Sequence, residues 1–313
     1  MARRSRGRHR SERPGPAGFL VVDKPPGVTS HDVVDAARRW LGTRRVGHLG
    51  TLDPAATGVL PLAVREATKL VPFFEGGAKC YAGSIRLGIE TDTLDAEGQV
   101  TRRHEGALPD EAAVAEALTE FLGEIEQIPP MFSAVKQDGV PLHKLAREGV
   151  EVERKPKSVR IDRFELIKYA PPDLEVEVDC AAGTYVRALA ADLGVRLGCG
   201  AHLASLRRTR SGPFTEEQAV SEAVLNREAE EGTVAERLIA PVNALGYPVV
   251  RLTEAEAERL RQGGDIPAPD SPITPGTRLA ALEPGGNLLA VVEARPGRRL
   301  QPVRVLRPSG GRV

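Results

Sequence analysis

The sequence contains few of the residues that cross-linked or metal-stabilised proteins use. Only three of its 313 residues are cysteines, Cys80, Cys180 and Cys199, and they lie far apart with no Cys-x-x-Cys pair. We therefore expect neither a disulfide framework nor a structural zinc site, and a reducing cytoplasm fits this composition.

Long apolar segments are also missing. No run approaches the ~18 residues that a membrane helix needs, and the N-terminus has arginines but not the apolar segment of a signal peptide. Aromatic residues make up only 4% of the chain, yet 41% of it is hydrophobic. We therefore expect a cytoplasmic protein without a membrane span, large enough for about two domains and a sizeable core.

Motifs of the common cofactor-dependent and hydrolytic enzymes are absent as well. The spacing of Gly47, Gly50 and Gly58 does not match GxGxxG, and there is no P-loop, HExxH or GxSxG. Asp92 and Asp95 could imitate a pair of catalytic carboxylates, but a solvated or capping turn is the favoured interpretation.

Charge is balanced overall but uneven along the chain. The 43 Lys and Arg residues match 43 Asp and Glu residues. Residues 1–18 hold six arginines and one acid, residues 295–313 hold six arginines and no acid, and residues 216–237 hold seven glutamates and two arginines. Arginine-rich ends suit a polyanionic partner. Solvated tails would look the same, so charge alone does not decide.

The N-terminal part of the chain shows where order begins. Residues 1–17 are predicted to be a disordered basic arm, and a buried strand is predicted at 18–23. Thr29 and Ser30 then cap a helix whose apolar residues recur at helical spacing until Gly42 ends it.

Further strands and helices follow without the regularity of a parallel α/β fold. Alternating apolar residues predict strands at 79–89 and 174–180, and helical spacing predicts helices at 110–122 and 187–197. From about residue 246, short apolar runs alternate with Gly/Pro turns around one brief helix at 253–262. The pattern predicts an α+β domain over 18–245 and a small β-barrel over 246–313.

The segment RRVGHLGTLDPAATGVL, residues 44–60, is the densest in chemically informative residues. Its glycines allow a ligand or another backbone to approach, and its leucines can hold the loop against a core. Asp53 in such a loop is a candidate nucleophile or base. An Asp-Pro turn, in which Asp53 only accepts backbone hydrogen bonds, explains the same residues. Local chemistry alone favours the turn.

Part of this segment, GHLGTLDPAATGVL at 47–60, closely resembles the catalytic signature of the TruB-type tRNA pseudouridine synthases. Other segments resemble the same family in the same order: KPPGVTS at 24–30, EATK at 66–69, KCY at 79–81, LGIETDTLDAEG at 87–98, QIPPMFSAVK at 127–136, LAREG at 145–149, GTYVR at 183–187, AHL at 201–203 and LRRTRSG at 206–212. The chain is identified as a member of this family.

The resemblance implies an isomerase that acts on tRNA. The family converts a uridine of the T-loop, uridine 55, to pseudouridine after flipping its base into a pocket: the N-glycosidic bond breaks, the base turns, and C5 joins C1′. The family uses no cofactor or metal. A carboxylate suits this chemistry because positive charge develops at the anomeric carbon, as it does in glycosidases.

By the same resemblance, Asp53 is the essential carboxylate, which either attacks C1′ or removes the C2′ proton. Tyr81 stacks on the flipped base and helps to remove the C5 proton. Arg187 pairs with Asp53 and keeps it ionised. The remaining family positions concern RNA binding: Tyr185 and Leu206 line the uracil pocket, His48 contacts the RNA where the nucleotide leaves its stack, and Lys24 and Lys69 are basic positions near the cleft.

Outside the family context these residues have ordinary explanations, such as a core tyrosine, a surface histidine and exposed lysines. The basic runs Arg44–Arg45 and 207–210 could bind phosphates, or their arginines could be ion-paired at the surface.

We therefore expect an α+β fold with a mixed, largely antiparallel sheet flanked by helices, and a C-terminal barrel similar to the family's PUA-like module. The expected enzyme is a monomer that acts on the tRNA T-stem-loop without a protein partner. Two alternatives stay open: an RNA-binding or RNA-folding module, and the catalytic subunit of a guide-RNA-directed ribonucleoprotein. An insertion at about 127–155 resembles the RNA-binding insertion of the stand-alone type and argues against the guided form.

Overall fold

The computed structural model of the chain describes residues 15–133, 136–137, 139–142, 145, 149–150, 152–270 and 272–306. Most of the expected basic arm and part of the expected insertion at 127–155 lie outside the described residues. No helix in the described ranges is long and apolar enough to cross a membrane.

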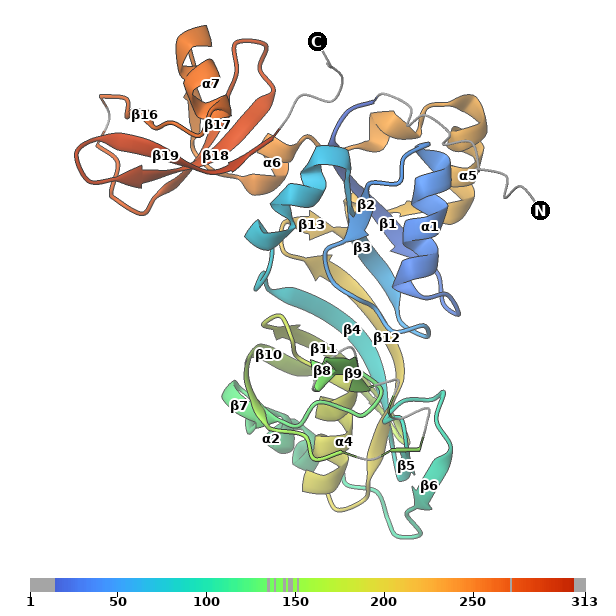
Figure 1. Ribbon diagram of the computed structural model, residues 1–313. Helices are drawn as coiled ribbons and strands as arrows, with labels where there is room; N and C mark the ends of the chain where they lie inside the picture. The colour runs from blue at the N-terminus through green and yellow to red at the C-terminus, as the bar shows by residue number, and fades with distance from the viewer. Residues whose placement is uncertain are drawn as a thin grey trace, which may run out of the picture.

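One ten-stranded sheet runs through the larger part of the molecule (Figure 1). Its central order is β14 (Val220–Ser221), β1 (Gly18–Lys24), β3 (Thr57–Val64), β12 (Ala201–Ser211), β4 (Lys79–Leu87), β11 (Asp173–Cys180), β10 (Lys157–Ala170) and β7 (Gly123–Gln127). β2 (Val46–His48) pairs with β3, and β13 (Phe214–Thr215) pairs with β12. Only the β1–β14 and β3–β12 pairs in this sheet are parallel. The mixed, largely antiparallel sheet is confirmed.

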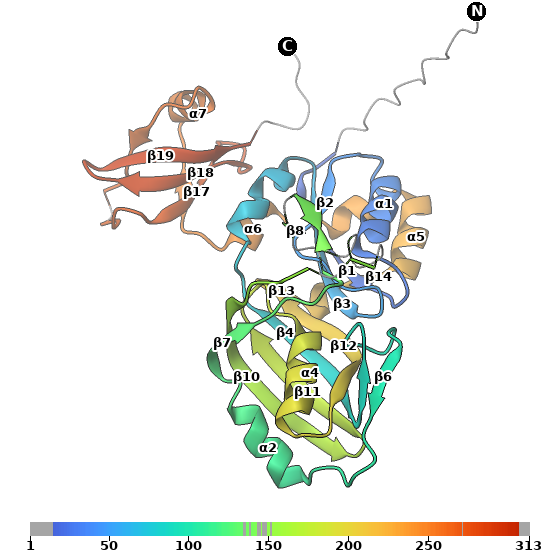
Figure 2. The same ribbon diagram turned by 60° about the horizontal axis from the view of Figure 1, so that its bottom comes forward.

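Helices flank this sheet as the sequence predicts. α1 (Ser30–Trp40) begins after Thr29, whose hydroxyl accepts a hydrogen bond from the Asp32 backbone N–H. α2 (Glu111–Thr119) and α4 (Val186–Arg196) lie together in front of the half of the sheet that holds β10, β11, β4 and β12 (Figure 2). α5 (Glu222–Glu231) lies beside α1 next to β1 and β14.

Several local boundaries differ from the sequence predictions. The strand predicted at 79–89 ends at Leu87, because Gly88 has a φ of +80° and turns the chain into a hairpin of β5 (Ile89–Thr91) and β6 (Val100–Arg103). The helix predicted up to Leu122 ends earlier, at Thr119. The short helices η1 (Arg65–Phe73) and α6 (Pro241–Leu245), and the small hairpin of β8 (Lys136–Gln137) and β9 (Val140–Pro141), were not predicted. The acidic stretch 216–237, whose pattern is helix-like, forms η2 (Glu216–Gln218), α5 and η3 (Val234–Arg237).

A second, curled sheet of five strands follows α6, as expected for a small C-terminal β unit (Figure 1). Its order is β15 (Val249–Arg251), β17 (Arg278–Leu282), β18 (Leu288–Arg295), β19 (Arg299–Val305) and β16 (Ile266–Pro267), with α7 (Glu254–Arg261) packed against it. Val291 and Leu306 of this unit share one buried cluster with Phe19, Leu70 and Phe214 of the larger part. The two units are therefore joined by an apolar contact.

Candidate active site

Asp53 lies in the loop between β2 and β3, and its neighbours in this loop are held from two sides. The backbone N–H of Leu52 donates to Ser30 Oγ at 2.8 Å, at the start of α1. The ammonium of Lys24, at the end of β1, donates to the carbonyls of Pro54 at 2.9 Å and Ala56 at 2.7 Å. The residues on both sides of Asp53 are therefore fixed to the first strand and the first helix.

The carboxylate of Asp53 pairs with Arg187, as the family resemblance implies. Arg187 Nε lies 2.8 Å from Asp53 Oδ2. The arginine side chain is only 5% exposed, whereas that of Asp53 is 39% exposed. Arg187 lies in the first turn of α4, so the helix presents its guanidinium to the loop while leaving one side of the carboxylate open.

The other nitrogens of Arg187 are also occupied. Nη1 donates to the carbonyl of Thr93 at 2.9 Å and Nη2 donates to that of Phe132, also at 2.9 Å. Nη1 also lies 3.5 Å from Asp95 Oδ2. These contacts fix the plane of the guanidinium, so Nε points at Asp53.

Asp95 is a site residue that the sequence interpretation missed. The turn at 91–98 was expected to be solvated or capping, and Asp95 is buried, so it is a capping residue that solvent does not surround. Its Oδ1 accepts hydrogen bonds from Thr93 Oγ1 at 2.5 Å and from the Glu97 backbone N–H at 3.1 Å, which leaves Oδ2 facing Arg187. Asp92 fits the expected capping role, since it accepts from the Gln99 N–H at 2.8 Å. Because Asp92 and Asp95 belong to the same turn pattern, the sequence does not indicate which of them faces Arg187.

Burial and charge act in opposite directions on Asp53. Withdrawal from solvent raises the pKa of its carboxyl above the usual value, and the nearby negative charge of Asp95 adds to this rise. Arg187 lowers the pKa by Coulombic attraction and by its hydrogen bond. Arg187 therefore favours the carboxylate in surroundings that otherwise favour the acid.

Tyr81 lies on β4 and is buried. Burial raises the pKa of its hydroxyl to about 12, while a hydrogen bond with Arg208 and the positive charge of that residue act to lower it. The charge of Asp53 also raises this pKa. Arg208 donates to the carbonyls of Gly50 and Thr51, so Tyr81 lies next to the loop that carries Asp53.

Tyr185 and Leu206 border the same region. Tyr185 precedes α4, and its backbone is held by Gln127, whose Oε1 accepts from the Tyr185 N–H at 2.7 Å. Burial raises the pKa of the Tyr185 hydroxyl, and the charge of Asp53 contributes to that rise. Leu206 lies on β12 opposite Gly83, and its side chain packs against the main core. Leu206 lies next to the end of the Asp53 loop, since its carbonyl accepts a hydrogen bond from Thr57 Oγ1 at 3.4 Å.

His48 and the two lysines occupy different kinds of surroundings. His48, at the end of β2, lies beside Gly50, and burial and the charge of Arg208 lower its pKa. Lys24 is completely buried, and its three hydrogen bonds, to Pro25, Pro54 and Ala56, all go to carbonyls. Its ammonium is therefore committed to the Asp53 loop. Lys69 pairs with the buried Glu66 at 2.6 Å.

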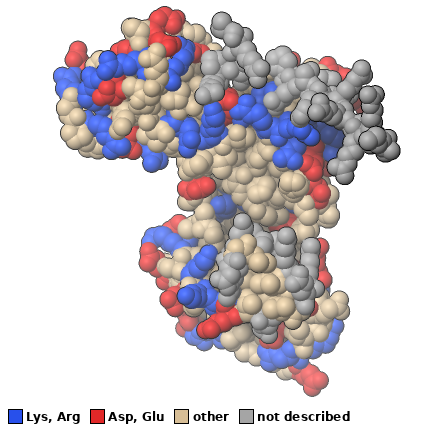
Figure 3. Space-filling model, viewed as in Figure 1, with Lys and Arg blue, Asp and Glu red and all other residues tan. Residues whose placement is uncertain are grey.

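The two basic runs, 44–45 and 207–210, differ in how exposed their arginines are and in whether these form ion pairs. Arg44 is exposed, and Arg45 pairs with Glu66. Lys and Arg side chains gather on the face that holds η1 and α1, whereas over the C-terminal sheet they are mixed with Asp and Glu (Figure 3). In the second run, Arg207 pairs with Asp23 and Glu216, as the ion-pair alternative expects. Arg208, however, is completely buried, so neither surface alternative holds for it.

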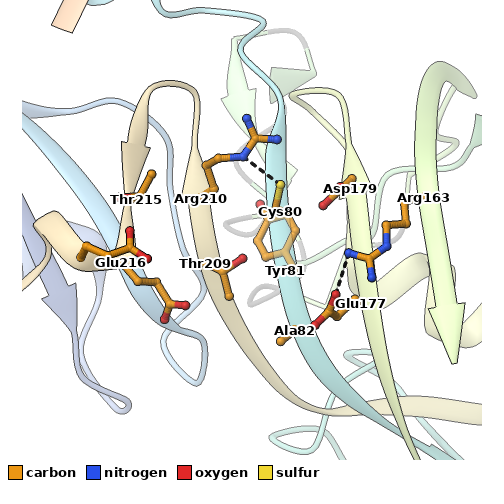
Figure 4. A pocket seen from close by; sticks show the side chains of 11 residues that line it. Cys80, Tyr81, Ala82, Arg163, Glu177, Asp179, Thr209, Arg210, Thr215 and Glu216 are labelled. Carbon is orange, nitrogen blue, oxygen red and sulfur yellow. Dashed lines mark hydrogen bonds and ion pairs between the residues drawn. The ribbon is translucent and has the colours of Figure 1, made fainter. Parts of the chain in front are cut away.

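A pocket beside β4 and β12 holds the third arginine of that run (Figure 4). Arg210 Nε donates to Cys80 Sγ at 3.1 Å there, and Arg163 pairs with Glu177. Burial raises the pKa of the Cys80 thiol. Among the described residues, no cluster of three or more His, Cys, Asp or Glu side chains could hold a metal ion.

The arrangement around Asp53 suits chemistry at a sugar carbon. A half-exposed carboxylate can reach a ligand, a fixed guanidinium keeps it charged, and a tyrosine ring and apolar side chains lie beside it. A carboxylate in such a place can attack an electron-poor carbon or accept a proton. An aromatic ring beside it can stack on a planar base that has left its helix.

Comparison with solved structures defines the class. The chain is similar to a structure described as an H/ACA RNP bound to a substrate RNA containing 2′-deoxyuridine, with a TM-score of 0.70, 26% identity and coverage of 93% of this chain and 86% of that one. It is equally similar, at a TM-score of 0.70 and 28% identity, to a chain of a Cbf5-Nop10-Gar1 complex, covering 93% and 85%. The fold is that of the pseudouridine synthases.

Comparison of sequences defines the family. The N-terminal domain of the TruB family of pseudouridylate synthases matches residues 38–186, and two C-terminal domains of the same enzymes match 187–245 and 247–307. Proteins named tRNA pseudouridine synthase B are 44% identical in Geobacter sulfurreducens, over 90% of this chain and 94% of that one, and 46% identical in Rhodococcus jostii, over 94% and 95%. The chain belongs to the TruB family of pseudouridylate synthases.

Proposed function

We propose that this enzyme converts uridine 55 in the T-loop of tRNA to pseudouridine. The observation that carries the proposal is the carboxylate of Asp53, held 2.8 Å from a buried arginine in a fixed loop and open on one side. The names of the relatives at 44% and 46% identity support tRNA as the substrate.

In the proposed reaction, the target base leaves its stack and lies against Tyr81, between Tyr185 and Leu206. Asp53, as a carboxylate, acts at C1′ or at the C2′ proton, and the N-glycosidic bond breaks. The detached uracil turns, and its C5 joins C1′, which displaces Asp53 from C1′ or, on the other route, is accompanied by return of the proton to C2′. Tyr81 then helps to remove the C5 proton. The electron pair of the C5–H bond restores the C5–C6 double bond, and N1 gains a proton. Arg187 favours the ionised form of Asp53 before it reacts.

We assign the remaining predicted positions to RNA contact or to support. His48, at the rim, is proposed to touch the RNA where the nucleotide flips. The exposed Arg44 and the basic C-terminal unit, proposed as a PUA-like domain over 246–313, are suited to phosphate contacts. Lys24 is better assigned to supporting the Asp53 loop, because its ammonium is buried. Lys69 keeps a proposed place near the RNA, with Glu66 as its partner.

A guide-RNA-directed enzyme is the second candidate, since one of the similar solved structures is described as an H/ACA RNP bound to a substrate RNA. Sequence identity favours the stand-alone form, at 44–46% against 26–28%. We therefore propose a monomer that acts in the cytoplasm and needs neither a guide RNA nor a protein partner.

The test is an assay of the purified chain on unmodified, full-length tRNA with no other RNA or protein added. Pseudouridine should form, and mapping at nucleotide resolution should place it at position 55 alone. A tRNA with cytidine at position 55 is the control and should give no product. Activity only after addition of a guide RNA, or modification at another position, would contradict the proposal.

A further inference from the structure

Arg208, on β12, is completely buried and is the largest such side chain in the described part of the chain. Each hydrogen bond that its guanidinium donates to the backbone ends on a carbonyl around the Asp53 loop: Nε donates to Val59 at 2.8 Å, Nη1 to Thr51 at 3.2 Å and Nη2 to Gly50 at 3.2 Å. Its side chain also forms a hydrogen bond with Tyr81.

These three carbonyls lie on both sides of Asp53 in the sequence. Gly50 and Thr51 precede it, and Val59 follows it on β3. One planar guanidinium therefore joins the two ends of the loop, and its fork of donors fixes the distance and angle between them.

The hydrogen bonds of Arg208 depend on the close approach of β12 to β3 near Gly58. A Cβ at position 58 would lie 2.3 Å from the carbonyl oxygen of Arg208, and Gly58 has a φ of +96°. β12 thus passes unusually close to the start of β3 at this point. The close approach brings the Arg208 side chain beneath the loop.

A buried charge is costly unless its surroundings compensate for it. A neutral side chain could fill the same space at lower cost, so a specific task for the charge is a reasonable inference. The carbonyls that Arg208 holds belong to the loop that must place Asp53 against the sugar, and small displacements of a reacting group are costly to the rate.

We propose that Arg208 is a positioning residue for the reaction, which fixes the loop between Gly50 and Val59 and so places the Asp53 carboxylate. This inference rests on the proposed role of Asp53. Arg208 acts on the first chemical event, at the sugar, and not on removal of the C5 proton by Tyr81.

The experiment compares Arg208→Gln and Arg208→Lys with the parent enzyme under single-turnover conditions at saturating enzyme. Two T-stem-loop RNAs are used, one with uridine and one with 5-fluorouridine at the target position. Fluorine removes the C5 proton, so this RNA still requires cleavage of the N-glycosidic bond and formation of the C5–C1′ bond, but no C5 deprotonation. The matched control is Arg86→Gln, on β4, which breaks a surface ion pair with Asp173 of β11.

For both Arg208 variants, the rate constant should fall on the order of 100-fold with either RNA, while the Kd for the RNA stays at the parent value. Arg86→Gln should match the parent. Circular dichroism and the reaction amplitude report the fraction of enzyme that is folded and active, and the rate constant reports how fast that fraction reacts. If Arg208→Gln does not fold, Arg208→Lys tests the proposal.

Three results would overturn the proposal: parental rates in both variants, a loss of rate explained entirely by weaker RNA binding, or a defect only with the uridine RNA, which would mean that Arg208 acts through Tyr81. The parent and Asp53→Asn are assayed alongside. An inactive parent or an active Asp53→Asn would contradict the proposed function itself, whereas failure of the Arg208 prediction alone leaves that function intact.

Discussion

Replacement of Arg187 by methionine should move the acidic limb of the pH–rate profile to higher pH. The change removes the positive charge that lies 2.8 Å from Asp53 Oδ2 but keeps much of the side-chain volume. Burial already raises the pKa of Asp53, and Arg187 opposes that rise. Without Arg187 the pKa rises further, so a larger share of the enzyme holds Asp53 as the inactive acid at any given pH below the limb.

The size of the shift follows from the geometry. Two unit charges about 4 Å apart interact by about 4 kcal/mol at an effective dielectric constant of ~20. The side chain of Asp53 is 39% exposed, so solvent screening should leave roughly half of this energy. About 2 kcal/mol corresponds to roughly 1.5 pKa units, and we expect the limb to move upward by about that amount.

The assay is a single-turnover measurement at saturating enzyme, from acidic to alkaline pH, on an unmodified T-stem-loop. Arg187→Lys is the control, because it keeps the charge but has fewer donors for Thr93 and Phe132. It should be slower than the parent, with its limb near the parental position. A limb in Arg187→Met that coincides with that of the parent, with chemistry shown to be rate-limiting, would refute the reasoning.

Three further predictions concern other residues of the site. Tyr81→Phe keeps the aromatic ring but loses the hydroxyl, so RNA should bind with parental affinity while product formation falls severely; Tyr81→Leu should impair both, and near-parental turnover by Tyr81→Phe would limit Tyr81 to stacking. Lys24→Met removes a buried ammonium that holds the carbonyls of Pro54 and Ala56, so its thermal unfolding temperature should fall by more than that of the control Lys69→Met. Equal stability of the two variants, with a selective loss of RNA affinity in Lys24→Met, would instead favour an RNA contact for Lys24. Burial and the charge of Arg208 lower the pKa of His48 and so favour its neutral ring. His48→Gln should therefore weaken RNA binding to a similar extent at pH 6.5 and 8, whereas a defect confined to the lower pH would indicate a charged histidine.

The sequence allowed much of the fold to be predicted because local signals and tertiary packing agree. Thr29 caps α1 as its residue type suggests, and the alternation at 174–180 forms β11 within one residue of its predicted start. The boundary at Gly88 was missed because a single positive-φ glycine looks the same in a turn as in an irregular strand.

Only part of the site was predicted, and the predicted part rests on the family pattern and not on local structural signals. Asp53 and Arg187 stand out by a family pattern, and the ion pair between them is present. Asp95 and Arg208 did not stand out, because their task depends on contacts with residues far away in sequence: Asp95 faces a helix that begins at Val186, and Arg208 reaches carbonyls about 150 residues earlier. The basic run at 207–210 does not indicate which of its arginines is buried once the segment forms a strand.

The most direct test of the account is the activity of Asp53→Asn on the unmodified T-stem-loop. Asparagine keeps the shape of aspartate but is a poor nucleophile and a poor base. The variant should fold, bind the RNA with parental affinity and form no detectable pseudouridine, while the parent converts the target uridine. Substantial turnover by an Asp53→Asn preparation shown by mass spectrometry to be free of deamidation would contradict the central role of this carboxylate.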